Sequence, residues 1–120
     1  MGVEIERFLG LAKALPECEQ QQGEKYTTFR VRGRAFGYLW PRTATVGLKQ
    51  TLLEQEALVA ERPEVFEVQF TAGGFGWVVV RLDGIDADEL SELLLEAWFH
   101  TAPEELHPAQ PSPEELRARS

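Results

Sequence analysis

Five short stretches of this chain alternate apolar with polar side chains, and this pattern constrains the fold more than any other feature of the sequence. Alternation with a period of two places apolar side chains on one face of a β-strand and polar ones on the other. The stretches lie at about 28–32, 35–40, 43–49, 66–71 and 77–82. Turn sequences at Arg32-Gly33-Arg34 and Gly73-Gly74-Phe75-Gly76 predict two β-hairpins. We therefore expect a sheet with one face in the core and one face in water.

Three other stretches carry apolar residues at steps of three and four, which predicts amphipathic helices. They lie at about 5–15, 51–60 and 86–98. Pro16 and Pro63 end the first two, and Thr51 and Asp86 are each followed three residues later by a glutamate, as in a capping box. The order is helix, three strands, helix, two strands, helix. We expect an α+β fold in which helices cover one face of an antiparallel sheet of about five strands.

The length of 120 residues suits a single domain, which we place at residues 1–102. Four prolines lie between residues 103 and 113, so residues 103–120 are predicted to form a Pro-rich tail with one short helix starting near Ser112. No apolar run approaches the roughly 18 residues of a membrane span, and the N-terminus does not resemble a signal peptide. We expect a cytoplasmic protein that does not bind membranes.

Charge is distributed unevenly along the chain. The net charge is −8, yet the segment from Lys25 to Lys49 holds six basic residues and no acidic one, whereas residues 61–120 hold thirteen acids and four bases. Within a Debye length of about 8 Å, a local cluster of cations outweighs distant acids. The basic segment is therefore the candidate surface for a negatively charged partner.

Strand parity predicts which basic residues share a face. Residues that alternate with the apolar positions lie on the open face, away from the helices. This face is predicted to carry Arg30, Arg32, Lys49, Trp77 and Arg81, with the small residues Ala35 and Gly37 leaving room beside them. Arg34 lies at a hairpin tip. Cations beside an aromatic side chain suit phosphates and stacked bases, although any antiparallel sheet exposes arginine, lysine and threonine on its wet face.

The sequence also resembles the MmcQ/YjbR family. The likeness spans about residues 3–106 and is carried by four segments and the start of the last helix: Leu15-Pro16-Glu17-Cys18-Glu19, residues 29–37, Val46-Gly47-Leu48-Lys49, residues 77–84, and Asp88-Glu89-Leu90. The chain departs from the family at residues 70–76, where many members have a polar segment with His or Asn. The resemblance implies a small bacterial protein with a frataxin-like fold and a predicted DNA-binding function through a double-wing arrangement.

Catalytic and metal-binding patterns are weak. The chain has three serines and two histidines, and no nucleophile lies beside a general base, so we expect neither an enzyme nor a cofactor. His100, Glu104 and His107 have helical spacing, but Pro103 interrupts it, so we predict no metal site. The acids of the last helix are interpreted as a cap and a solvated face.

A second surface lies on the last helix, where Leu95 and Phe99 fall outside the main apolar stripe. Either the tail leucines Leu106 and Leu116 cover them, or a protein partner or second copy of the chain does.

We predict a non-enzymatic binding module that contacts DNA through the open face and the two hairpin tips. The predicted contact residues are Arg30, Arg32, Arg34, Lys49, Trp77 and Arg81. The alternative is a protein-interaction or small-anion-binding domain that uses the same face.

Overall fold

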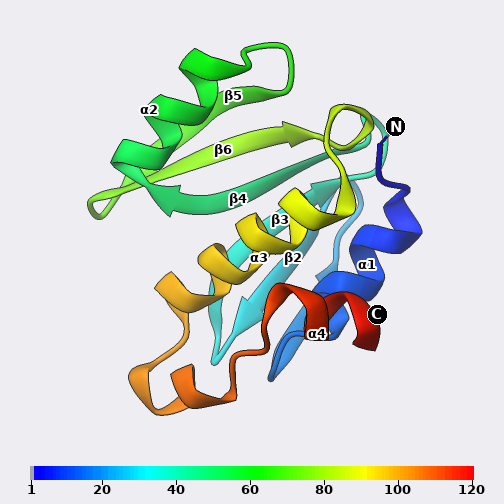
Figure 1. The fold of residues 1–120 in the computed structure, drawn as a ribbon, viewed down its shortest axis with the longest axis vertical. Coiled ribbons are helices and arrows are strands. Elements are labelled where there is room, and N and C mark those ends of the chain that lie inside the picture. The colour runs from blue at the N-terminus through cyan, green and yellow to red at the C-terminus, as the bar shows by residue number, and fades with distance from the viewer. Residues whose placement is uncertain (1) are drawn as a thin grey trace.

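The computed structural model describes residues 2–120, whose strands form one six-stranded antiparallel sheet in the order β1-β2-β3-β4-β6-β5. The strands are β1 (Cys18–Gln22), β2 (Thr27–Val31), β3 (Arg34–Trp40), β4 (Thr45–Thr51), β5 (Phe66–Ala72) and β6 (Phe75–Arg81). The helices are α1 (Ile5–Lys13), α2 (Leu52–Glu61), α3 (Ala87–Thr101) and α4 (Pro113–Arg119), with short 3₁₀ helices η1 (Leu82–Gly84) and η2 (Glu104–Ala109). The α+β prediction is confirmed (Figure 1).

The sheet has six strands rather than about five because β1 gives no alternating signal. Its sequence, Cys-Glu-Gln-Gln-Gln, is polar throughout, and every residue after Cys18 is exposed. As an edge strand, β1 pairs its backbone with β2, from Cys18 opposite Val31 to Gln22 opposite Thr27, and buries little else. An edge strand with polar side chains resists pairing with other chains.

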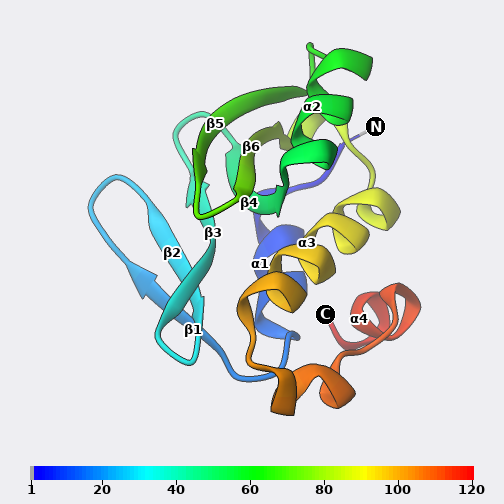
Figure 2. The ribbon, with the colours of Figure 1, turned by 90° about the vertical axis from the view of Figure 1, so that its left-hand side faces the viewer.

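All four helices lie on one side of the sheet (Figure 2). Between the two layers lies the core, in which Trp98, Phe8, Phe29 and Phe36 are among the largest fully buried side chains. The indole Nε1 of Trp98 donates a hydrogen bond of 2.9 Å to the Pro16 carbonyl, which fixes α3 against the turn after α1. Of the helices in residues 2–120, none is long and apolar enough to cross a membrane.

The segment expected to be a tail folds back onto the helices. Ser112 and Glu115 form a complete capping box at the start of α4, and Pro113 occupies the first turn. Leu116 is fully buried and Leu106 is 9% exposed, and both belong to the main core. Leu95 is also buried. Of the Leu95 and Phe99 pair, only Phe99 is exposed and could contact another chain. Residues 103–120 thus complete the helical layer.

Replacing Leu116 with alanine tests this packing. We expect Leu116→Ala to lower the free energy of unfolding by about 2–5 kcal/mol, because it removes a buried side chain and leaves a cavity. Urea unfolding followed by circular dichroism measures the change. Leu53→Ala is the control, since Leu53 is 78% exposed and its loss should change the stability little. Equal stability of the Leu116→Ala variant and the wild type would show that α4 is not part of the cooperative fold.

Candidate nucleic-acid interface

A β-bulge decides which side chains lie on the helix-free face of the sheet. Phe29 pairs with Gly37, but the next residue of β2, Arg30, pairs with Ala35, so Phe36 is the extra residue of β3. Phe36 and Leu39 are buried at 0% and 2% exposure. One extra residue reverses the faces of all residues beyond it.

The bulge corrects the prediction made from alternation. The pattern over residues 35–40 assigned Phe36, Tyr38 and Trp40 to one face and left Gly37 open to water. In the structure Phe36 stays in the core, while Tyr38 and Trp40 lie on the open face. Gly37 is itself buried. The open face is therefore aromatic where small residues were expected.

A second bulge acts in the same way on β5. The register between β5 and β6 shifts between Val68 and Phe70, which makes Gln69 the extra residue and places Phe70 opposite Trp77. The alternation over residues 66–71 had grouped Phe70 with the core residue Phe66. Instead, the Phe70 ring is 40% exposed on the open face.

The two bulges place Tyr38, Trp40 and Phe70 beside Tyr26 and Trp77. The five rings form one continuous cluster, which we call the aromatic platform: Tyr26, Tyr38, Trp40, Phe70 and Trp77. Ring centroids are 5.2 Å apart for Phe70 and Trp77, 5.4 Å for Tyr38 and Trp77, and 6.0 Å for Tyr38 and Trp40. Tyr26 lies 5.8 Å from Tyr38. Trp77 forms the floor at 6% exposure, whereas Tyr26 is 45% exposed. The rings are inclined to one another, by 29° for Tyr38 and Trp40 and by 75° for Tyr26 and Tyr38, and their exposed parts offer apolar surface to an incoming planar group.

Gly47 makes room for the platform. A Cβ at this position of β4 would lie 2.3 Å from Gln69 Oε1 and 3.0 Å from the Trp40 ring, so both side chains cover the bare backbone. A glycine inside a strand often marks such a close approach. Gly47 is thus the one sequence signal that could have located aromatic side chains on this face.

Two of the predicted cations lie on the open face. Arg30 is half-buried in β2 opposite Ala35, and Arg81 is exposed at the end of β6 opposite Thr45. Neither makes an ion pair within residues 2–120. Trp77, predicted beside them, lies in the platform floor. These three residues lie on the predicted face.

Arg32 does not. Strand β2 ends at Val31, and Arg32 occupies the following turn with a φ of 50°. Its guanidinium lies 2.6 Å from the Glu17 carboxylate and 2.9 Å from that of Glu105. The hydrogen bond from Arg32 lowers the pKa of Glu17. Arg32 therefore connects three turns of the chain, and its charge is neutralised by neighbours.

Lys49 is also not free on the surface. It is 9% exposed, and its Nζ lies 3.4 Å from the His100 carbonyl and 4.3 Å from the centre of the Phe75 ring. Burial, and then the nearby charge of Arg34, lowers the pKa of Lys49. Arg34 itself is exposed at the start of β3. Lys49 thus points to the end of α3, and Arg34 remains available at the hairpin tip.

Two hollows border the platform near the β1–β2 loop, which projects away from the helices (Figure 2). One, of about 380 Å³, includes Lys25, Tyr26 and Arg30 in its lining. The other, of about 440 Å³, includes Lys25, Trp40 and Arg42. Glu24 lines both. Each hollow therefore joins an aromatic ring of the platform to two cations, and Lys25 and Arg42 are site residues that the strand pattern did not select.

A methyl group at Gly47 tests how tightly the platform is packed. We expect Gly47→Ala to lower the free energy of unfolding by about 1–3 kcal/mol, because the added Cβ overlaps Gln69 and the Trp40 ring. Thermal unfolding measures the change. Gly10→Ala is the control, since its Cβ would lie 3.4 Å from Ser120 in ordinary contact, and alanine favours helix α1. A stable Gly47→Ala variant would mean that Trp40 and Gln69 move aside freely.

Comparison with known proteins gives a family and a fold. A family model described as YjbR matches residues 13–100. The crystal structure of the Deinococcus radiodurans protein DR2400, described as a DUF419 domain, superposes with a TM-score of 0.73 at 20% identity, covering 93% of this chain and 86% of that one. At this identity the likeness shows the fold alone. No curated protein matches the sequence.

Proposed function

The chain belongs to the YjbR family, and we propose that it is a non-enzymatic module that binds single-stranded DNA on the aromatic platform. The observation that carries the proposal is the platform itself, five neighbouring rings on the sheet face that no helix of residues 2–120 covers. Unpaired bases expose their flat faces, and stacking on aromatic side chains contributes about 1–3 kcal/mol per base. Duplex bases are already stacked on each other, so the platform favours single strands.

Cations around the platform supply the contacts to phosphate. Arg30 and Lys25 line one hollow, Arg42 and Lys25 line the other, and Arg81 is exposed at the end of β6. Contacts of this kind position the backbone of a nucleic acid without reading its sequence. We therefore expect weak base preference.

Acidic groups limit the affinity. Glu19 is opposite Arg30 in the β1–β2 pairing, Glu67 is opposite Val79, and Glu24 lines both hollows. Together with the net charge of −8, they repel a polyanion. At physiological salt, the repulsion from charges more than about 8 Å away is largely screened. Stacking must consequently contribute more to binding here than in a strongly basic protein.

Substitutions of the exposed rings test the stacking. In fluorescence anisotropy with a labelled oligothymidine of about 15 nucleotides, we expect Tyr26→Ala and Phe70→Ala each to weaken binding about 5- to 30-fold, the loss of roughly 1–2 kcal/mol of stacking. Leu53→Ala, an exposed apolar residue on α2, is the matched control and should bind as the wild type. Unchanged affinity of both ring variants, or tighter binding to duplex than to single strands, would contradict the proposal.

Salt and charge test the phosphate contacts. Four contacts from Lys25, Arg30, Arg42 and Arg81 predict a slope of about −3 in log affinity against log salt for a single strand. Arg30→Gln and Arg42→Gln should each reduce this slope, whereas Arg119→Gln on α4 should not. Absence of binding at low salt would favour the alternative, a protein-interaction or small-anion-binding domain on the same face.

A further inference from the structure

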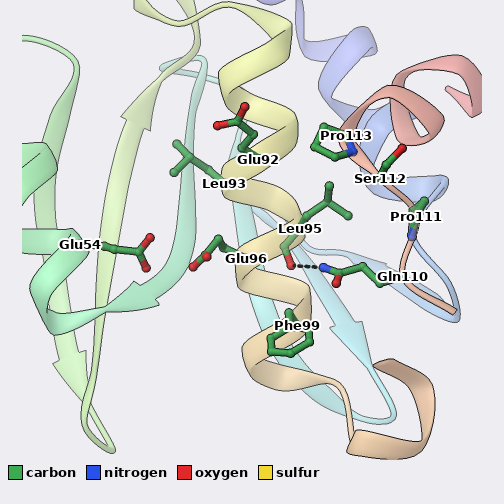
Figure 3. Close-up of a pocket in the computed structure, with 10 residues that line it drawn as sticks. All are labelled: Glu54, Glu92, Leu93, Leu95, Glu96, Phe99, Gln110, Pro111, Ser112 and Pro113. Carbon is green, nitrogen blue, oxygen red and sulfur yellow. Dashed lines mark hydrogen bonds between the residues drawn. The ribbon is translucent and has the colours of Figure 1, made fainter. Parts of the chain in front are cut away.

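A groove lies on the helix side of the molecule, away from the aromatic platform. It has a volume of about 630 Å³ and runs between α3, the start of α2 and the segment before α4 (Figure 3). Its lining residues are Glu54, Glu92, Leu93, Leu95, Glu96, Phe99, Gln110, Pro111, Ser112 and Pro113. Three of the ten are glutamates, which makes the groove acidic.

Two of these glutamates face each other. Glu54, in the first turn of α2, points across the groove toward Glu96 in α3 (Figure 3). His100 lies one helical turn after Glu96, and its Nε2 is 3.1 Å from Glu96 Oε2. One side-chain atom from each of Glu54, Glu96 and His100 lies within 4.8 Å of the others. All three side chains are half-buried.

Local structure holds each of these side chains in place. Glu54 belongs to the capping box of α2, where its Oε1 accepts hydrogen bonds from the backbone N–H and hydroxyl of Thr51 at 3.3 and 3.0 Å. Glu96 and His100 are four residues apart on α3 and therefore share a helix face. The His100 ring lies 5.4 Å from the Phe75 ring. The arrangement is organised before any ligand arrives.

Within residues 2–120, the two carboxylates have no lysine or arginine partner, and Glu96 pairs only with His100. The nearest lysine that contacts this region, Lys49, directs its Nζ to the His100 carbonyl and the Phe75 ring. Burial first, and then the facing Glu54, raises the pKa of Glu96, although His100 lowers it, so placing the two carboxylates together is unfavourable. A bound cation would remove this cost.

A buried glutamine lies behind the groove lining. Gln50 is fully buried at the end of β4, and its Nε2 donates to the carbonyls of Lys49 and Leu93 at 2.8 and 3.1 Å. Leu93 lines the groove three residues before Glu96. The Gln50 Oε1 has no hydrogen-bond partner in the described part of the chain. A buried acceptor without a partner is costly.

We propose that Glu54, Glu96 and His100 bind one divalent transition-metal ion of the Zn²⁺ type. An imidazole together with two carboxylates suits zinc and its neighbours, whereas Mg²⁺ and Ca²⁺ prefer oxygen ligands alone. Zinc bonds of about 2.0–2.2 Å hold tetrahedral ligand atoms roughly 3.4 Å apart, so small rotamer changes close the site. Three protein ligands leave the fourth position open toward the groove.

The site differs from the histidine pattern visible in the sequence. His107 does not join His100, because its Nε2 lies 3.1 and 3.0 Å from the carbonyls of Phe99 and Ala102. Its ring stacks on Phe99 with centroids 4.0 Å apart. The proposed ligand set instead combines one residue of α2 with two of α3, and only the fold brings them together.

Calorimetry with zinc chloride on the full-length protein tests the proposal. We expect one site per chain and a higher melting temperature with zinc present. Glu96→Gln and His100→Ala should each weaken zinc binding at least about tenfold, as should Glu54→Gln, which keeps the capping box. His107→Ala and Glu56→Gln are the matched controls and should bind zinc as the wild type does.

A Co²⁺ titration adds a readout of the ligands, since the visible spectrum of Co²⁺ reports its coordination geometry. The Co²⁺-bound wild type should show the visible absorption bands of tetrahedral Co²⁺, and the His100→Ala variant should not show them. Melting in the absence of metal shows whether each variant is folded; Glu54→Gln and Glu96→Gln should melt no lower than the wild type because they relieve repulsion. Zinc binding that is absent, or equal in the three ligand variants and the controls, would overturn the proposal.

Discussion

The pairing of β2 with β3 decides which side chains lie on the open face of the sheet, and the candidate binding surface depends on it. If β3 had no extra residue and Arg30 stayed opposite Ala35, Tyr38 and Trp40 would point into the core, and the open face would carry Gly37 and Leu39 in their place. The single extra residue, Phe36, reverses this arrangement beyond the bulge. Phe36 remains in the core at 0% exposure, so the bulge moves two rings outward and keeps the Phe36 ring in the interior.

The helical layer is held together by contacts other than the strand pairing. Trp98 is hydrogen-bonded to the Pro16 carbonyl, which joins α3 to the opposite end of the sequence, and the buried Leu116 holds α4 against the same layer. The α4 segment also forms one wall of the acidic groove (Figure 3). Packing of the C-terminal residues therefore shapes the groove, while the sheet bulges shape the aromatic platform. The two candidate sites lie on opposite sides of the sheet and depend on different contacts.

The protein concentrates opposite charges on these two sides. Within residues 2–120, the arginines beside the platform have no ion-pair partner, and the glutamates of the groove have no lysine or arginine partner. The net charge of −8 describes neither surface. The platform can attract a polyanion and the groove a metal cation, because salt screens the field from the opposite side of the sheet over about 8 Å. Arg32 does not add to the platform, because direct ion pairs with Glu17 and Glu105 neutralise its charge.

The sequence by itself determined the layers of the fold and the positions of Arg30 and Arg81, because period-two and helical patterns, caps and prolines act over a few residues. It did not determine β1, whose polar residues are held only by pairing with β2, nor the outward direction of Tyr38 and Phe70. Tertiary structure alone decided those, because a bulge arises where two strands pair and is not visible in the apolar and polar alternation of either sequence. It also decided the meeting of Glu54 with Glu96 and His100, since two helices far apart in the chain must pack before their side chains share a groove.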